Sequence, residues 1–180
     1  MQRAVEVANA DGNLDVAVLA AGTGTGGPLL MSTRESWQTV LNTNLLGAFL
    51  TIKHAGQAMA ANGGGSVVAL SSIAGVRTHR FMTEYCVSKA GLEMLVMNAA
   101  DELGPMNIRV NSLVPGATLT ERQRALWWTP EEDRQFVDLQ ALKFRLEATD
   151  VARVALFMAS DEARGCTGAN FVVDAGLTQN

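Results

Sequence analysis

Cysteine and histidine are scarce in this 180-residue sequence, which contains two of each. Cys86 and Cys166 share no metal-ligand spacing with His54 or His79, so a structural zinc site is excluded and we expect no bound metal. Two lone thiols in a domain of this size are typical of a reducing compartment.

Long uncharged stretches are missing as well. The longest, residues 16–33, is broken by glycines and a proline, and the start of the chain contains no apolar stretch of the kind that a signal peptide needs. The sequence therefore predicts neither a secretion signal nor a membrane span. We expect a cytoplasmic protein.

The net charge is mildly acidic, because 14 Lys and Arg residues stand against 18 Asp and Glu residues and give a formal charge of −4. This balance argues against a nucleic-acid partner. With 48% hydrophobic residues the chain is too apolar to be disordered. Its length is that of one ordinary domain, so we expect a single domain over residues 1–180.

Four short segments are continuously apolar rather than alternating, which is the pattern of parallel strands that are covered on both faces. They are Leu14–Ala21, Ser66–Ser72, Asn107–Val114 and Ala169–Asp174. Helical segments separate them. The fold class is therefore α/β, with a parallel sheet and helices on both faces.

Apolar residues recur at helical spacing in the segments between these strands. A Ser32-Thr-Arg-Glu35 capping box predicts the start of a long helix over residues 33–61, and three glycines end it. The other predicted helices are Thr83–Leu103, a short one that opens at Thr129-Pro130, and Asp150–Ser160. An active-site lid fits in the long segment at about residues 117–146.

Gly22, Gly24 and Gly27 satisfy the spacing GxGxxG after a predicted strand. A dinucleotide fingerprint also needs a helix that opens at the last glycine and an acidic residue about 20 residues further on. Here a proline follows, and no acidic residue lies between Glu35 and Glu84. We interpret the segment as a glycine-rich loop that borders a cofactor.

A stronger pattern surrounds the second long helix. Tyr85 and Lys89 are four residues apart, so they share one face, which continues the apolar stripe of that helix. Ser72 closes the preceding strand, at the sheet edge where ligands bind in open parallel sheets. Asn44 lies two helical turns after Trp37, on the buried stripe of the first long helix. Each residue alone is explained by packing, but the four together favour an active site.

Tyr85 and Lys89 would form an acid/base pair. An ordinary tyrosine has a pKa of about 10, and lowering that value to about 7 takes roughly 4 kcal/mol. One ammonium at about 4 Å supplies this amount at an effective dielectric constant near 20. We therefore expect Lys89 to lower the pKa of Tyr85 and to make it a usable general acid/base.

These residues resemble the short-chain dehydrogenase/reductase (SDR) family. The resemblance rests on Ser72, on Tyr85-Cys-Val-Ser-Lys89 thirteen residues later, and on Asn44-Leu-Leu-Gly47. It continues in Asn111-Ser-Leu-Val-Pro-Gly116 with Thr120, in Cys166-Thr-Gly168 and in Val173-Asp-Ala-Gly176, and covers the chain from about Leu14 to its end. It implies the C-terminal part of a doubly wound Rossmann-type fold.

The resemblance also implies roles for the site residues. Tyr85 would be the catalytic acid/base, Lys89 would bind the nicotinamide ribose and lower the Tyr85 pKa, Ser72 would hold the substrate oxygen, and Asn44 would anchor a proton-relay water. The implied cofactor is NAD or NADP. The residues expected to contact it are Ala21, Gly22, Tyr85, Lys89, Pro115, Gly116, Thr118 and Thr120.

The implied reaction is hydride transfer between the nicotinamide and the carbinol carbon of a small alcohol or carbonyl substrate, in a homodimer or homotetramer. The alternative is a non-catalytic assembly module, whose helices 33–61 and 83–103 would pair with another subunit without binding a cofactor.

Three features depart from the family pattern. The family's Asn-Asn-Ala-Gly is Leu19-Ala-Ala-Gly22 here, and its Asp-Gly-Gly is Asp174-Ala-Gly176. Its first half, with the TGxxxGxG loop and the residue that selects NAD or NADP, has no counterpart, which amounts to about 60 residues in two βα units. We therefore expect a truncated domain, a fragment or a remnant, that binds the dinucleotide weakly and exposes Leu14–Ala21 as an apolar sheet edge.

The substrate side permits two interpretations. Thr120–Arg124, Trp127-Trp-Thr-Pro130 and Gln140-Ala-Leu-Lys143 resemble SDR sugar dehydrogenases that oxidise aldoses. The tryptophans would pack on a sugar while Arg122, Gln123 or Arg124 reach its hydroxyls, although docking the lid on the core explains them equally well. His79, Arg80 and Phe81 would equally serve a larger alcohol or ketone, such as a hydroxysteroid or an oxoacyl thioester.

Overall fold

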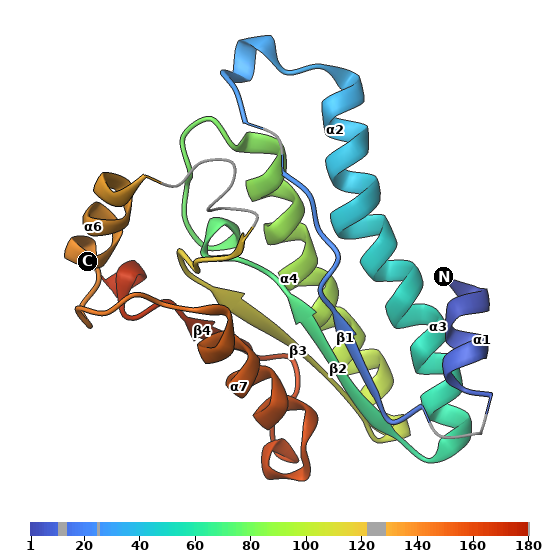
Figure 1. Cartoon of the computed structure of the whole chain (residues 1–180). Coiled ribbons are helices and arrows are strands. Elements are labelled where there is room, and N and C mark those ends of the chain that lie inside the picture. Colours follow the sequence, from blue (N-terminus) through green and yellow to red (C-terminus); the bar gives the residue numbers. More distant parts are fainter. Residues whose placement is uncertain (11–13, 25, 122–128, 180) are drawn as a thin grey trace.

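The computed structural model describes residues 1–10, 14–24, 26–121 and 129–179 (Figure 1). The helices are α1 (Gln2–Ala8), α2 (Arg34–Leu41), α3 (Gly47–Asn62), α4 (Thr83–Leu103), α6 (Pro130–Leu139) and α7 (Ala148–Ala159). The strands are β1 (Val16–Leu19), β2 (Gly65–Leu70), β3 (Ile108–Pro115) and β4 (Asn170–Val173). Within these residues no helix is long and apolar enough to cross a membrane.

The four strands form one parallel sheet in the order β1-β2-β3-β4. Helices α3 and α4 cover one face of the sheet and α7 covers the other (Figure 1). The predicted α/β class and all four predicted strands are therefore confirmed. Because every strand runs in the same direction, the carboxyl ends of the strands lie at one edge of the sheet, where ligands bind in open α/β folds.

The core has one layer on each face of the sheet. Val67 and Ala69 of β2 pack with α3 and α4, whereas Val68 between them packs with α7. This alternation follows from the two-residue period of a strand. It explains why β2 reads as continuously apolar, since both of its faces are covered.

The predicted long helix over residues 33–61 is one continuous helical segment, but it is not α-helical throughout. Residues Asn42–Leu46 form a turn of π-helix between α2 and α3. Such a bulge inserts one residue into the helical repeat and is frequent at functional sites. Nothing in the apolar stripe of the sequence predicted it.

The predicted cap of this helix is shifted by one residue. Thr33, not Ser32, is the N-cap, and its Oγ1 accepts a 3.1 Å hydrogen bond from the Ser36 N–H. The Ser32 hydroxyl instead donates to Oε1 of Glu84 on α4, at 2.7 Å. A tertiary contact with a carboxylate thus takes the serine that sequence alone assigned to the cap.

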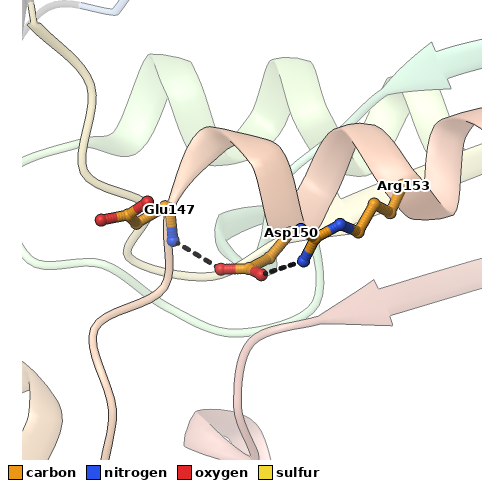
Figure 2. A network of polar contacts seen from close by, with 3 residues as sticks. All are labelled: Glu147, Asp150 and Arg153. Atoms are coloured by element: carbon orange, nitrogen blue, oxygen red, sulfur yellow. Dashed lines mark hydrogen bonds and ion pairs between the residues drawn. The ribbon is translucent and has the colours of Figure 1, made fainter.

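Helix α7 begins two residues before the predicted start at Asp150. The Asp150 carboxylate accepts a 3.0 Å hydrogen bond from the backbone N–H of Glu147 and contacts Arg153 at 3.4 Å (Figure 2). Asp150 therefore caps the helix from its third position rather than beginning it. Helix α1, which the sequence did not predict, lies against α3 (Figure 1).

Candidate active site

Tyr85 and Lys89 lie one turn apart near the start of α4. The Lys89 side chain is 4% exposed, and its Nζ lies 5.6 Å from the centre of the Tyr85 ring. Nζ donates a 2.6 Å hydrogen bond to the carbonyl oxygen of Leu70, the last residue of β2. The predicted stacking of the two side chains on one helix face is therefore present, with the ammonium held at the carboxyl end of the sheet.

Ser72 reaches the same place from the strand side. It follows β2 and caps a short 3₁₀ turn, Ile73–Gly75, by accepting a 3.1 Å hydrogen bond from the Ala74 N–H. Its hydroxyl also lies near enough to the Tyr85 phenol to lower the pKa of that phenol. The structure thus brings together the hydroxyls of Ser72 and Tyr85, which the sequence placed thirteen residues apart.

The pKa values of the pair differ from the sequence-based expectation. Burial raises the pKa of the Tyr85 phenol above its ordinary value, and the hydrogen bond from Ser72 offsets only part of that rise. Burial lowers the pKa of Lys89 to about 8, against the opposing effect of Glu93. The expected lowering of the Tyr85 pKa by Lys89 is absent from this geometry, because the ammonium is directed at a carbonyl rather than at the phenol oxygen.

Asn44 lies in the π-helical turn and is 2% exposed. Its Oδ1 accepts from the Thr23 N–H at 2.8 Å, and its Nδ2 donates to the Thr23 carbonyl at 2.8 Å and to Ser88 Oγ at 2.9 Å. The side chain therefore fixes the loop after β1 to helix α4. The role implied by the resemblance, anchoring a relay water, stays a prediction.

The glycine-rich segment after β1 is a loop, as interpreted from the sequence. Among its described residues, Gly24 packs on the Tyr85 ring, where a β-carbon would lie 3.2 Å from Tyr85 Cδ2. A β-carbon on Gly22 would lie 3.7 Å from Lys89 Nζ. The predicted cofactor contact Gly22 thus lies beside Lys89, and both Gly22 and the preceding Ala21 are exposed.

The other predicted cofactor contacts follow β3 at the same sheet edge. The Gly116 N–H donates to the Val173 carbonyl at 2.9 Å, and a β-carbon on Gly116 would lie 2.7 Å from Asp174 Cβ. Thr118 Oγ1 donates to the Gly116 carbonyl at 3.1 Å. Pro115 ends the strand, and Thr120 is exposed.

Two buried carboxylates near the site were missed by the sequence analysis. Glu84 accepts hydrogen bonds from the hydroxyls of Ser32 and Ser36, at 2.7 and 2.9 Å. Beside it lies a cavity of about 290 Å³ lined by Gly26, Gly27, Pro28, Met31, Ser32, Thr33, Ser36 and Glu84. Glu93 lies one turn beyond Lys89 on the inner face of α4 and is 6% exposed. Its place on the Leu92–Val96 apolar stripe was the available signal.

The donor set fits the ribose end of a dinucleotide. An ammonium has three N–H donors, and among the described residues Lys89 uses one of them, toward Leu70. The remaining donors and the Tyr85 hydroxyl suit adjacent ribose hydroxyls. Residues 122–124 and the Trp127–Trp128 pair lie outside the described residues, and the described part of the chain contains no cluster of three potential metal ligands.

Comparison with known proteins places the chain in a class. A family model described as enoyl-(acyl carrier protein) reductase matches residues 1–178. A solved short-chain type dehydrogenase/reductase from Mycobacterium ulcerans superimposes with a TM-score of 0.95 at 36% identity, over 99% of this chain and 66% of that one. The chain belongs to the short-chain dehydrogenase/reductase family, as its motifs predicted.

Two relatives with names are sugar dehydrogenases. A probable galactose dehydrogenase of Rhizobium meliloti is 39% identical over 145 residues, 81% of this chain and 57% of the relative. D-xylose 1-dehydrogenase of Caulobacter vibrioides is 38% identical over 165 residues, 92% of this chain and 66% of the relative. The chain thus spans about three fifths to two thirds of the length of these relatives.

The structure of a hydroxysteroid dehydrogenase is also similar to that of this chain. A 7α-hydroxysteroid dehydrogenase, solved in complex with NADH and 7-oxo glycochenodeoxycholic acid, superimposes with a TM-score of 0.92 at 30% identity. The match covers 97% of this chain and 68% of that one.

Proposed function

We propose that the protein is an NAD(P)-dependent oxidoreductase that interconverts an alcohol and a carbonyl compound. The observation that carries the proposal is that the Ser72 hydroxyl lies near enough to the Tyr85 phenol to lower its pKa, with the buried Lys89 ammonium one helical turn away. An assembly module has no use for a buried lysine whose pKa has been lowered by burial, since desolvating a charge destabilises the fold.

In the oxidation direction the chain's residues move a proton. Ser72 and Tyr85 together hold the substrate oxygen, and Tyr85 as the phenolate accepts the hydroxyl proton while the carbonyl forms. When bound, a nicotinamide would supply the acceptor for the hydride of the carbinol carbon. Lys89 holds the ribose and, once turned toward the phenol oxygen, favours the phenolate by its charge. In the reduction direction Tyr85 returns the proton.

The proposed substrate is an aldose. Support comes from the names of the relatives, which include galactose, xylose and rhamnose dehydrogenases at 36–39% identity. A 3-alpha-(or 20-beta)-hydroxysteroid dehydrogenase is 37% identical, so a hydroxysteroid is the competing substrate class.

We further propose a cytoplasmic homo-oligomer. The outer faces of α3 and α4 carry exposed apolar side chains, namely Phe49, Val87, Met94 and Met97, which are between 40 and 56% exposed. Clustered apolar groups of this kind are typical of subunit interfaces. Sedimentation of the protein at several concentrations tests the association.

The function is tested by an assay of the protein with NAD⁺ and NADP⁺. The panel contains D-xylose, D-galactose, a hydroxysteroid and a 3-hydroxyacyl thioester. We expect dinucleotide reduction with the aldoses. Turnover of the apolar substrates alone would contradict the sugar proposal, and no turnover with any alcohol would contradict the oxidoreductase.

A further inference from the structure

Glu93 extends the inner face of α4 by one more turn beyond Tyr85 and Lys89, since the three residues stand at intervals of four. It is buried, with 6% of its surface exposed, and it takes no part in the proton transfer proposed above. A buried carboxylate is unfavourable unless its oxygens are partnered. The partners of Glu93 therefore indicate what it does.

Both carboxylate oxygens of Glu93 accept hydrogen bonds. Oε1 accepts from the Ser71 hydroxyl at 2.7 Å, and Oε2 accepts from Asn170 Nδ2 at 3.1 Å. Two donors and no bonded acceptor are what the ionised carboxylate requires. Glu93 thus joins helix α4 to the residue that precedes Ser72 and to the first residue of β4.

Glu93 also contacts the far end of the turn that carries Ser72. A β-carbon on Gly75 would lie 2.5 Å from Glu93 Oε1 and 3.0 Å from the backbone carbon of Lys89. Residue 75 must therefore be glycine for the turn to approach the helix this closely. Glu93 thus accepts a hydrogen bond from the first residue of the segment Ser71–Gly75 and packs closely against the last, with Ser72 between the two contacts.

Charge is the second link. The ionisable groups of α4 that face Lys89 are Tyr85 and Glu93. The described parts of the neighbouring elements present the hydroxyls of Ser71 and Ser72 and the amide of Asn44 toward this face. Arg109 of β3 turns to the other face of the sheet, where its guanidinium donates to the carbonyls of Met158, Ala159 and Ser160.

We propose that Glu93 is a positioning residue: it holds Ser72 against Tyr85 through the Ser71–Gly75 turn, and it is the counter-charge of Lys89. The proposal rests on the proposed function, because it assigns Glu93 to the support of the same three residues. It gives Glu93 no contact with the substrate.

The two links are separated by variants of the 180-residue chain itself. Glu93→Gln keeps the size of the side chain and removes the charge, whereas Ser71→Ala keeps the charge and removes one end of the support. Glu102→Gln, an exposed acid on the same helix, is the matched control.

The effect of the Glu93 charge is measured as the pKa of the Lys89 ammonium in an NMR titration. The variants Lys53→Arg and Lys143→Arg assign the signals of the three lysines. Because Glu93 raises the Lys89 pKa, we expect Glu93→Gln to lower it by about 1 unit, while Glu102→Gln leaves it unchanged. An unchanged Lys89 pKa in Glu93→Gln would overturn the counter-charge.

The positioning of Ser72 by Glu93 is measured through the pKa of Tyr85, the only tyrosine in the chain. Its phenolate absorbance titrates without interference from another tyrosine. We expect Ser71→Ala and Glu93→Ala to raise its pKa in the same direction as Ser72→Ala, because each loosens the Ser72 hydrogen bond. A Tyr85 pKa that rises in Ser72→Ala and stays unchanged in the other two would overturn the support.

Kinetics of the protein complete the test. We expect Glu93→Gln to reduce kcat and to move the upper limit of the pH–rate profile to lower pH, because Lys89 then loses its proton earlier. A reduced kcat with an unmoved profile would contradict the counter-charge. If the parent protein shows no hydride transfer, the proposed function fails, while the two titrations still decide the role of Glu93.

Discussion

Lys89 Nζ donates a 2.6 Å hydrogen bond to the carbonyl oxygen of Leu70. This bond joins the helix that carries Tyr85 to the end of the strand that precedes Ser72. It also places an ammonium where 4% of the lysine remains exposed, so the charge has lost most of its hydration. The residue proposed to bind the ribose is therefore held at a cost in stability.

Lys89→Met should stabilise the chain near neutral pH. The pKa of Lys89 lies at about 8 instead of 10.5, and at about 1.4 kcal/mol per pKa unit the buried charge costs roughly 3 kcal/mol. The variant also loses the hydrogen bond to Leu70, which lowers its free energy of unfolding by about 1 kcal/mol. We expect a net gain of about 2 kcal/mol in the free energy of unfolding, measured with urea at pH 7.

The gain should shrink as the pH rises. Between pH 8 and 10.5 the folded chain has released the proton that the unfolded chain still binds, so the stability of the parent rises with pH in that window. At pH 10 we expect Lys89→Met to differ little from the parent. Lys53→Met, on the exposed side of α3, is the control. Equal stabilisation at both pH values would show that the charge is not its source.

The predicted part of the site came from patterns that are local in sequence. Tyr85 and Lys89 share a face because a helix repeats every 3.6 residues, and Ser72 lies at the sheet edge because it follows a strand. The contacts that complete the site are tertiary and have no such pattern. The bond between Ser32 and Glu84 spans 52 positions, and that between Asn170 and Glu93 spans 77.

Electrostatics was the weakest part of the sequence analysis. The expected effect of Lys89 on Tyr85 assumed that the ammonium points at the phenol oxygen, which helical spacing alone does not establish. The structure directs it to Leu70 and buries the phenol, and the pKa of Tyr85 changes in the opposite direction. Side-chain direction and desolvation both depend on neighbours that are distant in sequence.

The phenol of Tyr85 should titrate above an ordinary tyrosine. Burial raises its pKa, and the Ser72 hydrogen bond lowers it by a smaller amount. We expect Ser72→Ala to raise the pKa further in a spectrophotometric titration of the chain. Ser160→Ala, distant from the site, should leave it unchanged. An unchanged or lower pKa in Ser72→Ala would mean that the Ser72 hydroxyl does not stabilise the phenolate.

Glu84 should stabilise the fold in a pH-dependent way. Hydrogen bonds from its own backbone N–H and from the hydroxyls of Ser32 and Ser36 hold its pKa below the ordinary value of 4.5. Its stabilising effect is therefore complete above that value and is lost as the pH falls through the lower, folded-state pKa. We expect Glu84→Gln to destabilise the chain by about 1–2 kcal/mol at pH 7.

The same variant should differ less from the parent once the pH falls below the folded-state pKa of Glu84, where the carboxylate of the parent is protonated. Glu35→Gln, an exposed acid in the first turn of α2, serves as the control and should change stability by less than about 0.5 kcal/mol. A difference between Glu84→Gln and the parent that does not change with pH would rule out the charged hydrogen bonds as its cause.

Ala175 departs from the glycine of the family pattern, and the structure shows the consequence. Its φ is +54°, in the left-handed region that disfavours a β-carbon. We expect Ala175→Gly to raise the free energy of unfolding by about 0.5–1 kcal/mol and, with it, the thermal midpoint. Ala148→Gly, in the first turn of α7, is the control and should lower it. A lower thermal midpoint in Ala175→Gly would contradict this prediction. It would show that the restricted backbone of alanine is needed to keep the Ala175 carbonyl in place, where it accepts a hydrogen bond from the Leu142 N–H.

The central claim is that Tyr85 is the acid/base of a hydride-transfer enzyme, and the replacement of Tyr85 tests that claim most directly. Tyr85→Phe removes one oxygen atom and keeps the ring that packs on Gly24. We expect kcat/KM for the aldose to fall at least about 100-fold, with dinucleotide affinity and thermal midpoint close to those of the parent. A Tyr85→Phe enzyme that retains most of its turnover would contradict the account.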